Sequence, residues 1–171
     1  MSAPASALRF VPVTSDSQIA SVAELAHEIW YEYYPPLIGR AQVDYMVSKF
    51  QSPAALAQQL ADGYEYFLVE REGRLIGYFA VLVKGEEQSL FLSKFYVLQR
   101  ERRSGTGRRA MEFIEQLARD RGLKSLWLTV NKGNPAVKAY ERLGFTIAAD
   151  LVMDIGGGFV MDDFRMEKSL G

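Results

Sequence analysis

The stretch RERRSGTGRR, residues 100–109, decides the fold. It follows an apolar segment that ends near Leu98 and precedes residues 110–118, whose apolar side chains repeat at helical spacing. The sequence therefore predicts a strand, an arginine-rich loop over 99–107 and a helix. Glycines let the backbone approach a ligand, and the free N–H groups and dipole of a helix start attract anions. With its arginines, the loop favours phosphate binding over a merely solvated charged turn.

A dinucleotide site is the first phosphate site to consider, because Gly105, Gly107 and Ala110 match G-x-G-x-x-A. The residues on either side of this match do not fit a dinucleotide site. Residues 99–104 separate the predicted strand from the first glycine, whereas the dinucleotide turn is tight. The following strand ends at Asn131 with no acidic residue for a ribose, and the nucleoside-triphosphate loop G-x-x-x-x-G-K-[ST] is absent.

Helices dominate the chain before this region. A short strand is expected over 8–13, and Ser15 with Gln18 forms a capping box for a helix that stops at Pro35-Pro36. Residues 41–50 are again helical in pattern. Ser52-Pro53 predicts the start of another helix, which Gly63 ends.

Strands dominate the region around the loop. They are expected over 65–70, 75–83, 89–98, 125–130, 145–155 and 159–167, with the helix after the loop closed by Gly122 and a short one over 134–144. A strand–helix–strand unit implies parallel pairing with a right-handed crossover. We therefore predict an α/β fold in which a mixed, mostly antiparallel central sheet has one parallel crossover and flanking helices. Residues 1–171 are expected to form a single domain.

Two blocks carry a family resemblance. Arg102-x-x-Gly105-x-Gly107 resembles the [Q/R]-x-x-G-x-[G/A] signature of the GNAT N-acetyltransferase superfamily. LWLTVN (126–131) followed by NPAVKAYERLGF (134–145) resembles the strand–Asn–helix–Tyr–Gly-Phe motif of the same superfamily. The blocks occur in the family's order, and the resemblance covers roughly residues 65–155.

The resemblance implies an acyl donor, acetyl-CoA, and residues that hold it. Main-chain groups of one strand would meet the pantetheine arm, one N–H polarising the thioester carbonyl. The loop would bind the pyrophosphate, and an asparagine would contact the cofactor or cap a helix. These cofactor-binding candidates are Phe95, Tyr96, Val97, Arg102, Arg103, Ser104, Gly105, Thr106, Gly107, Arg108, Asn131 and Asn134. For Asn134, capping before Pro135 is the favoured interpretation.

Tyr140 is the catalytic candidate. The resemblance implies that it protonates the departing thiolate, and a phenol of pKa near ~10 is suited to donate as sulfur gains charge. An ordinary packed aromatic is the alternative. Its position shortly before Gly144-Phe145 favours the catalytic role.

The general base stays open at the level of sequence. Many members of the superfamily carry a glutamate near the middle of the strand before the loop, where this chain has Ser93 and Lys94. A water chain, another carboxylate or His27 are the alternatives, although a lone histidine on a helix is more often structural. By analogy the first helices border the acceptor pocket, which nominates Glu28, Trp30, Tyr31 and Tyr34 as substrate-binding residues. For the aromatic residues, ordinary core and rim packing is the alternative. Asp162-Asp163 either attracts a cationic substrate or ends a solvated hairpin.

Composition excludes several classes of protein. The 171 residues carry a net charge of −1, which opposes a nucleic-acid binder. No cysteine and one histidine, His27, exclude thiol chemistry and a multi-histidine metal site, so no metal is expected. No apolar stretch is long enough for a membrane span and no secretory signal is recognised, which makes the cytoplasm the expected location.

The sequence thus predicts an acetyl-CoA-dependent N-acetyltransferase. Direct attack by a primary amine in a ternary complex is expected, since no nucleophile motif for an acyl-enzyme is present. The acceptor is a small molecule or a peptide or protein amine, and a homodimer is frequent in similar families. The alternative is a non-catalytic acyl-CoA-binding regulator or sensor. Nucleic-acid binding through 100–109 is the third reading.

Overall fold

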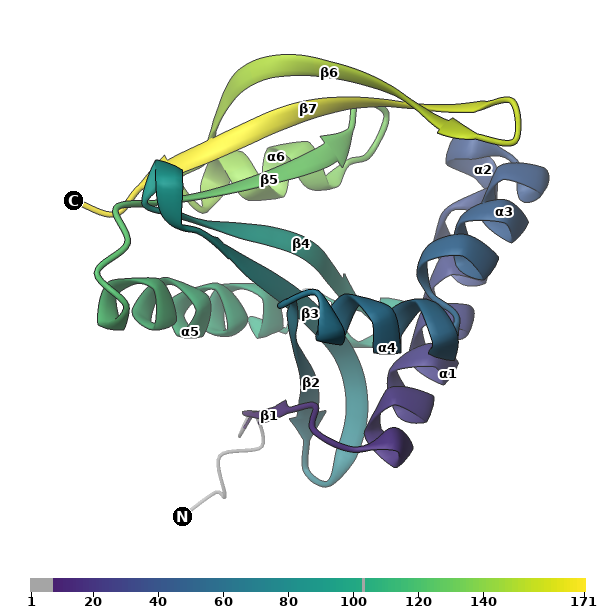
Figure 1. The fold of residues 1–171 in the computed structure, drawn as a ribbon, viewed down its shortest axis with the longest axis horizontal. Helices are drawn as coiled ribbons and strands as arrows, with labels where there is room; N and C mark the ends of the chain where they lie inside the picture. The colour runs from purple at the N-terminus through teal and green to yellow at the C-terminus, as the bar shows by residue number, and fades with distance from the viewer. Residues whose placement is uncertain (1–7, 103) are drawn as a thin grey trace. The chain divides into compact units, whose positions relative to one another are not determined.

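The computed structural model describes residues 8–102 and 104–171 (Figure 1). The prediction for Arg103 therefore lies outside the described residues. Contacts within the chain define two compact units. The first combines residues up to Val81 with Lys94–Ala110, and the second combines Leu82–Ser93 with Met111–Gly171. Strands β3 and β4 and helix α5 each contribute to both units.

The first unit contains the N-terminal helices and the strands at one edge of the sheet. Its elements are β1 (Leu8–Pro12), α1 (Asp16–Tyr33), α2 (Pro35–Ile38), α3 (Arg40–Phe50), α4 (Pro53–Ala61), β2 (Glu65–Arg71), most of β3 (Arg74–Lys84), the end of β4 (Ser89–Val97), a short 3-10 turn η2 (Gln99–Glu101) and the start of α5 (Thr106–Asp120). β1 pairs antiparallel with β2, and β2 with β3.

Local signals in the sequence explain several of these boundaries. Ser15 Oγ accepts a hydrogen bond from Gln18 N at 3.3 Å, and Gln18 Oε1 accepts from Ser15 N at 3.1 Å, so the predicted capping box is confirmed. Ser52 Oγ likewise accepts from Ala55 N at 3.2 Å at the start of α4. The prolines after Tyr34 begin the short helix α2 as well as ending α1.

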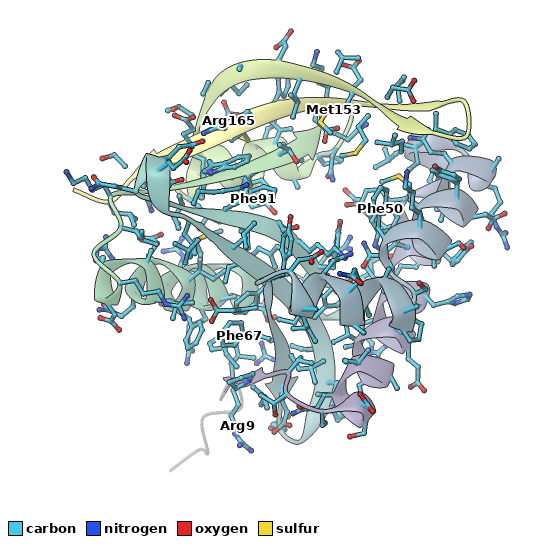
Figure 2. All side chains as sticks on the ribbon, in the orientation of Figure 1. Arg9, Phe50, Phe67, Phe91, Met153 and Arg165 are labelled. Carbon is cyan, nitrogen blue, oxygen red and sulfur yellow. The ribbon has the colours of Figure 1, made fainter. Side chains whose placement is uncertain are left out.

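The core of the first unit lies between α1 and the sheet. Val22, Ala26 and Ile29 line the buried side of α1, and Leu68 and Ala80 are buried on β2 and β3. On the opposite face of the sheet, the rings of Phe67 and Phe79, which are direct partners across β2 and β3, stack 5.0 Å apart. Figure 2 labels Phe67 among the side chains of these strands.

The second unit contains the C-terminal part of the sheet. Its elements are the 3-10 turn η1 (Gly85–Glu87), most of α5, β5 (Ser125–Asn131), α6 (Ala136–Arg142), β6 (Thr146–Gly156) and β7 (Phe159–Ser169). Leu126 and Leu128 of β5, Met166 of β7 and Ile114 of α5 are buried. β6 and β7 form one long hairpin (Figure 1).

The described part of the chain pairs seven strands in the order β1-β2-β3-β4-β5-β7-β6. β4 and β5 pair parallel over Ser89–Phe91 and Ser125–Trp127, and the other pairings with a defined register are antiparallel. The predicted mixed sheet with one parallel crossover is confirmed. The sequence did not indicate that β7, rather than β6, lies beside β5.

Small differences separate the predicted and observed boundaries. The helix after the loop begins at Thr106, inside the predicted loop, and the short helix begins at Ala136 rather than Asn134. Within the described residues, no helix combines the length and the apolar character needed to cross a bilayer.

Candidate functional site

The loop between β4 and α5 has the backbone geometry of an open helix start. Gly105 has a φ of +82°, in the left-handed region that favours glycine, and nothing lies within 4 Å of a Cβ built there. Gly107 is similarly open. Arg109 N donates to Gly105 O at 3.0 Å. The N–H groups of the first turn before Arg109 lack a helical acceptor by geometry, so they suit an anionic ligand.

A buried polar network from the β2–β3 hairpin holds this loop. Arg71 Nε lies 3.2 Å from Glu101 Oε1, with the two side chains only 9% and 12% exposed. Arg71 also donates to Thr106 Oγ1 at 2.7 Å and to Ser104 Oγ at 3.3 Å, and Ser104 donates to Glu101 O at 2.7 Å. Arg71 could not be predicted from the sequence, because the network joins residues more than thirty positions apart.

The side chains of Ser104 and Thr106 thus position the loop. Arg102 also turns inward, since its Nε donates to Val97 O at 3.1 Å and its guanidinium lies 4.3 Å from the centroid of the Tyr33 ring. The sequence indicates that several arginine side chains contact phosphate. Because Arg102 turns inward, fewer of them remain for that role. Arg108 is exposed.

Gly77 of β3 permits a close approach to the end of β4. A Cβ at Gly77 would overlap Tyr96 O and would lie 3.1 Å from Val97 Cα. The β4–β5 ladder ends at Phe91 and Trp127, so β5 does not pair with Phe95 to Val97. Val97 O accepts from Arg102 Nε.

An aromatic cluster brings two of the predicted acceptor residues to β4. The ring centroid of Trp30 lies 4.3 Å from that of Tyr34 and 5.4 Å from that of Tyr96. Tyr78 of β3 extends the cluster, 5.4 Å from Tyr96. Trp30, Tyr34 and Tyr96 thus lie together in one aromatic cluster.

The other predicted acceptor residues lie elsewhere on α1. Tyr31 donates a hydrogen bond to Asp44 of α3, which raises the pKa of Tyr31 and lowers that of Asp44. Glu28 is exposed and lies 3.2 Å from Arg100. Neither contacts the aromatic cluster through a described interaction. His27 is exposed and its ring lies against that of Tyr31.

Lys94 forms a second buried polar network in the first unit. The residue is 8% exposed, and its Nζ donates to Phe50 O at 2.7 Å and to Gln51 Oε1 at 3.2 Å. Tyr78 donates to the same Gln51 oxygen at 2.9 Å. Both acceptors of Lys94 are neutral, and burial lowers the pKa of Lys94 to about 7. A partly neutral lysine thus occupies the strand position where many superfamily members have glutamate.

The second unit holds the remaining predicted residues. Asn131 Oδ1 accepts from Gly133 N at 2.9 Å, and Asn134 Oδ1 accepts from Ala136 N at 2.8 Å. Both side chains therefore shape the turn that leads into α6, and the favoured capping interpretation of Asn134 agrees with this contact. Tyr140 lies on α6 with its ring 5.8 Å from that of Phe145, in an edge-on arrangement.

Comparison with known proteins identifies the family. Residues 21–145 match the acetyltransferase (GNAT) family, and the chain belongs to it. An uncharacterised N-acetyltransferase of Mycobacterium tuberculosis is 31% identical over 138 residues, which cover 80% of this chain and 87% of the relative. The streptothricin acetyltransferase of Streptomyces lavendulae is 37% identical over 86 residues, 50% of this chain and 46% of that protein.

A solved structure agrees in fold. The PaiA N-acetyltransferase of Thermoplasma acidophilum, in complex with coenzyme A, superposes with a TM-score of 0.77 at 17% identity, covering 95% of this chain and 99% of that one. The protein is an acyltransferase of the GNAT family, and acetyl-CoA is the acyl donor of that family. The resemblance carried by residues 102–107 and 126–145 is confirmed.

Proposed function

We propose that the protein moves an acetyl group from acetyl-CoA to a primary amine by direct attack in a ternary complex. The observation that carries the proposal is the open loop before α5. Its Gly105 adopts a positive φ beside a helix start, and the buried Arg71–Glu101 pair holds it in place. Acetyl-CoA fits this loop through its pyrophosphate, because backbone N–H groups at a helix start bind phosphate oxygens.

The residues proposed to hold acetyl-CoA are the loop and the end of β4. The N–H groups over 104–108 would bind the pyrophosphate, and Phe95 and Tyr96 would offer main-chain groups to the pantetheine arm. When bound, acetyl-CoA supplies a thioester that is activated toward amine attack. The protein's own residues orient the amine, exclude water and deliver a proton to the leaving sulfur.

Tyr140 is the proposed proton donor. The proposal rests on its place in the family motif between Asn134 and Gly144-Phe145. We expect Tyr140→Phe to lower kcat by about 100-fold, because a positioned general acid contributes on this order. Acetyl-CoA affinity should stay nearly unchanged, since phenylalanine retains the ring that meets Phe145. Tyr64→Phe, between α4 and β2, is the control. An unchanged kcat would remove Tyr140 from the mechanism.

The first experiment is a calorimetric titration with acetyl-CoA, with NAD and ATP as controls. Selective binding of acetyl-CoA is expected, followed by CoA release on a panel of amines. Binding without CoA release on any amine would favour the regulatory or sensor alternative. The panel begins with small cationic amines and streptothricin, because a relative similar over half of this chain is a streptothricin acetyltransferase.

A homodimer is also proposed. It is supported by the exposed apolar side chains of the edge strand β6 and its hairpin partner, namely Ile147, Val152, Met153 and Val160. Sedimentation of the purified protein tests it.

A further inference from the structure

Lys94 lies in the first unit, beside the residues proposed to meet the donor and the acceptor. It directly precedes Phe95, where the proposed pantetheine edge of β4 begins. Its Nζ and the Tyr78 hydroxyl donate to the same Gln51 oxygen, at 3.2 and 2.9 Å. The Tyr78 ring lies 5.4 Å from that of Tyr96, a member of the aromatic cluster. Lys94 is therefore next to the donor edge in the strand and linked to the cluster through two side chains.

The two oxygens that Lys94 binds do not depend on it. Phe50 O, at the end of α3 (Figure 2), accepts from Lys94 Nζ at 2.7 Å and also from Gln59 Nε2 of α4 at 3.1 Å. Gln51 Oε1 has the Tyr78 hydroxyl as its second donor. Burying a lysine among neutral groups lowers stability, and both oxygens would remain hydrogen-bonded without it. Packing and hydrogen bonding thus give no reason for a lysine at this position.

The hydrogen bonds of Lys94 match its neutral form. An uncharged amine has two N–H donors and one lone pair, whereas an ammonium group has three donors and no lone pair. Over residues 8–102 and 104–171, Lys94 donates to two acceptors, Phe50 O and Gln51 Oε1, and no ion pair reaches its Nζ. The residue is buried without being sealed, since 8% of its surface stays accessible. The lone pair of the neutral amine is left over to accept a proton.

In the described part of the chain, the titratable groups that face Lys94 are two tyrosines. The ring of Tyr66 on β2 lies 5.2 Å from Nζ, and Tyr78 on β3 shares its Gln51 oxygen. Burial raises the pKa of both tyrosines, so both stay neutral near pH 7. α3 and α4 contribute a carbonyl and amides, while Lys49 of α3 is exposed. Burial among these neutral groups lowers the pKa of Lys94 to about 7.

The carboxylates along the donor segment of the first unit already have partners. A carboxylate that accepts a proton gives up the favourable contact that its charge makes. Among the described residues, such contacts join Glu28 to Arg100, Glu32 to the Gln99 N–H and Glu101 to Arg71. Lys94 has no such contact to lose.

We infer that Lys94 is the general base of the transfer, and that its neutral Nζ takes a proton from the ammonium group of the acceptor. The inference rests on the proposed acetyl transfer to an amine. The deprotonated amine then attacks the thioester, so that a C–N bond forms and the C–S bond breaks. A second proton of the attacking nitrogen balances the one that the departing sulfur gains, and CoA leaves as the thiol. Lys94 passes its own extra proton to water.

The kinetic test is the pH dependence of kcat/KM on the panel amine that wild-type protein acetylates fastest. Wild-type kcat/KM should rise to a plateau above neutral pH, as Lys94 loses its proton. Lys94→Met should lower kcat/KM at pH 7.5 by roughly 100-fold, the usual contribution of a general base. Its kcat/KM should keep rising with pH, because only amine that is already neutral in solution then reacts. A Lys94→Met protein that keeps the wild-type plateau overturns the inference.

Two further variants separate the base from a structural role. Lys94→Arg keeps a cation and its donors but cannot lose a proton, so it should be as slow as Lys94→Met. Full activity of Lys94→Arg overturns the inference. Lys49→Met removes an exposed lysine from the same end of α3 and should keep the wild-type profile. Lys94→Met should fold and bind acetyl-CoA as the wild type does, since Gln59 and Tyr78 still donate to the two oxygens.

A second measurement is independent of turnover. Carbon NMR of Lys94 Cε, assigned by Lys94→Met, follows the titration of the amine, and a midpoint near neutral pH is expected. A midpoint near ~10.4, the ordinary value for lysine, overturns the inference, because the group would carry a proton throughout. If wild-type protein releases CoA with no amine, the proposed function fails. If it releases CoA while Lys94 titrates as an ordinary lysine, only the inference fails.

Discussion

At the scale of the residue, Gly77 shows how a single absent atom shapes the proposed donor site. β3 and β4 approach so closely there that a Cβ would overlap Tyr96 O. Both neighbours are backbone atoms, which give way only if the strand moves. Because Phe95 to Val97 form the proposed pantetheine edge, Gly77 links packing directly to the site.

Gly77→Ala should therefore destabilise the protein by about 1–3 kcal/mol, the usual cost of overpacking. We expect a lower Tm and weaker acetyl-CoA binding, measured by thermal unfolding and calorimetry. Gly85→Ala is the matched control, because nothing lies within 4 Å of its added Cβ. Equal Tm values for the two variants would show that β4 yields without strain.

Lys94 makes stability depend on pH. Burial lowers the pKa of Lys94 to about 7 in the folded state, whereas an unfolded lysine titrates near ~10.4. Between these values the unfolded chain binds more protons, so the free energy of unfolding rises with pH. The penalty for burying the lysine is thus greatest below pH 7 and fades toward alkaline pH.

We expect the Lys94 contribution to raise the free energy of unfolding by about 2 kcal/mol between pH 7 and 9, as followed by urea denaturation. Lys94→Met should remove this rise, and Lys124→Met, at an exposed position, should keep it. The window stops at pH 9 because burial raises the pKa of Tyr66 and Tyr78, which reverses the sign near pH 10. An identical slope in Lys94→Met would contradict the assignment.

At the scale of the element, the hairpin of β2 and β3 positions the loop that precedes α5. Arg71 is the last residue of β2 and reaches Glu101 in η2 and Thr106 at the start of α5. The three elements are thereby tied by one guanidinium, whose planar fork binds several oxygens at once.

Arg71→Met should cost roughly 3–5 kcal/mol of stability, because it leaves Glu101 buried without its partner. The dissociation constant for acetyl-CoA should rise about ten-fold as the loop loses its support. Arg74→Met, at an exposed position of the same hairpin, is the control for both measurements. A folded Arg71→Met protein with unchanged affinity would show that the loop holds its geometry alone.

At the scale of the whole molecule, the donor should stabilise the fold by mass action. A ligand that binds only the folded state at a hundred times its Kd adds about 2.7 kcal/mol. For a chain of this size that corresponds to a Tm increase of roughly 5–10 °C. Thermal unfolding with acetyl-CoA, and with NAD and ATP as controls, measures it. An equal shift with all three would indicate non-specific anion binding.

Much of the fold and part of the site follow from local sequence. The Ser15–Gln18 capping box, the Ser52-Pro53 helix start and the 102–107 loop were predicted because caps, turns and periodicity involve residues a few positions apart. The tertiary structure places Trp30 and Tyr34 beside Tyr96, whereas Tyr31 meets Asp44 and Glu28 meets Arg100, because helix geometry turns these residues to different sides of α1. Their roles toward an acceptor stay predictions.

The sequence by itself determined the order of elements, the class of sheet and the loop with its family motif. Only the tertiary structure decided that Arg71 holds this loop, that Lys94 has neutral partners, and that Asp163 is buried while Asp162 is paired in solvent. The reason is physical. Local patterns are set by neighbouring residues, whereas burial and charge pairing depend on side chains that only the folded chain brings together.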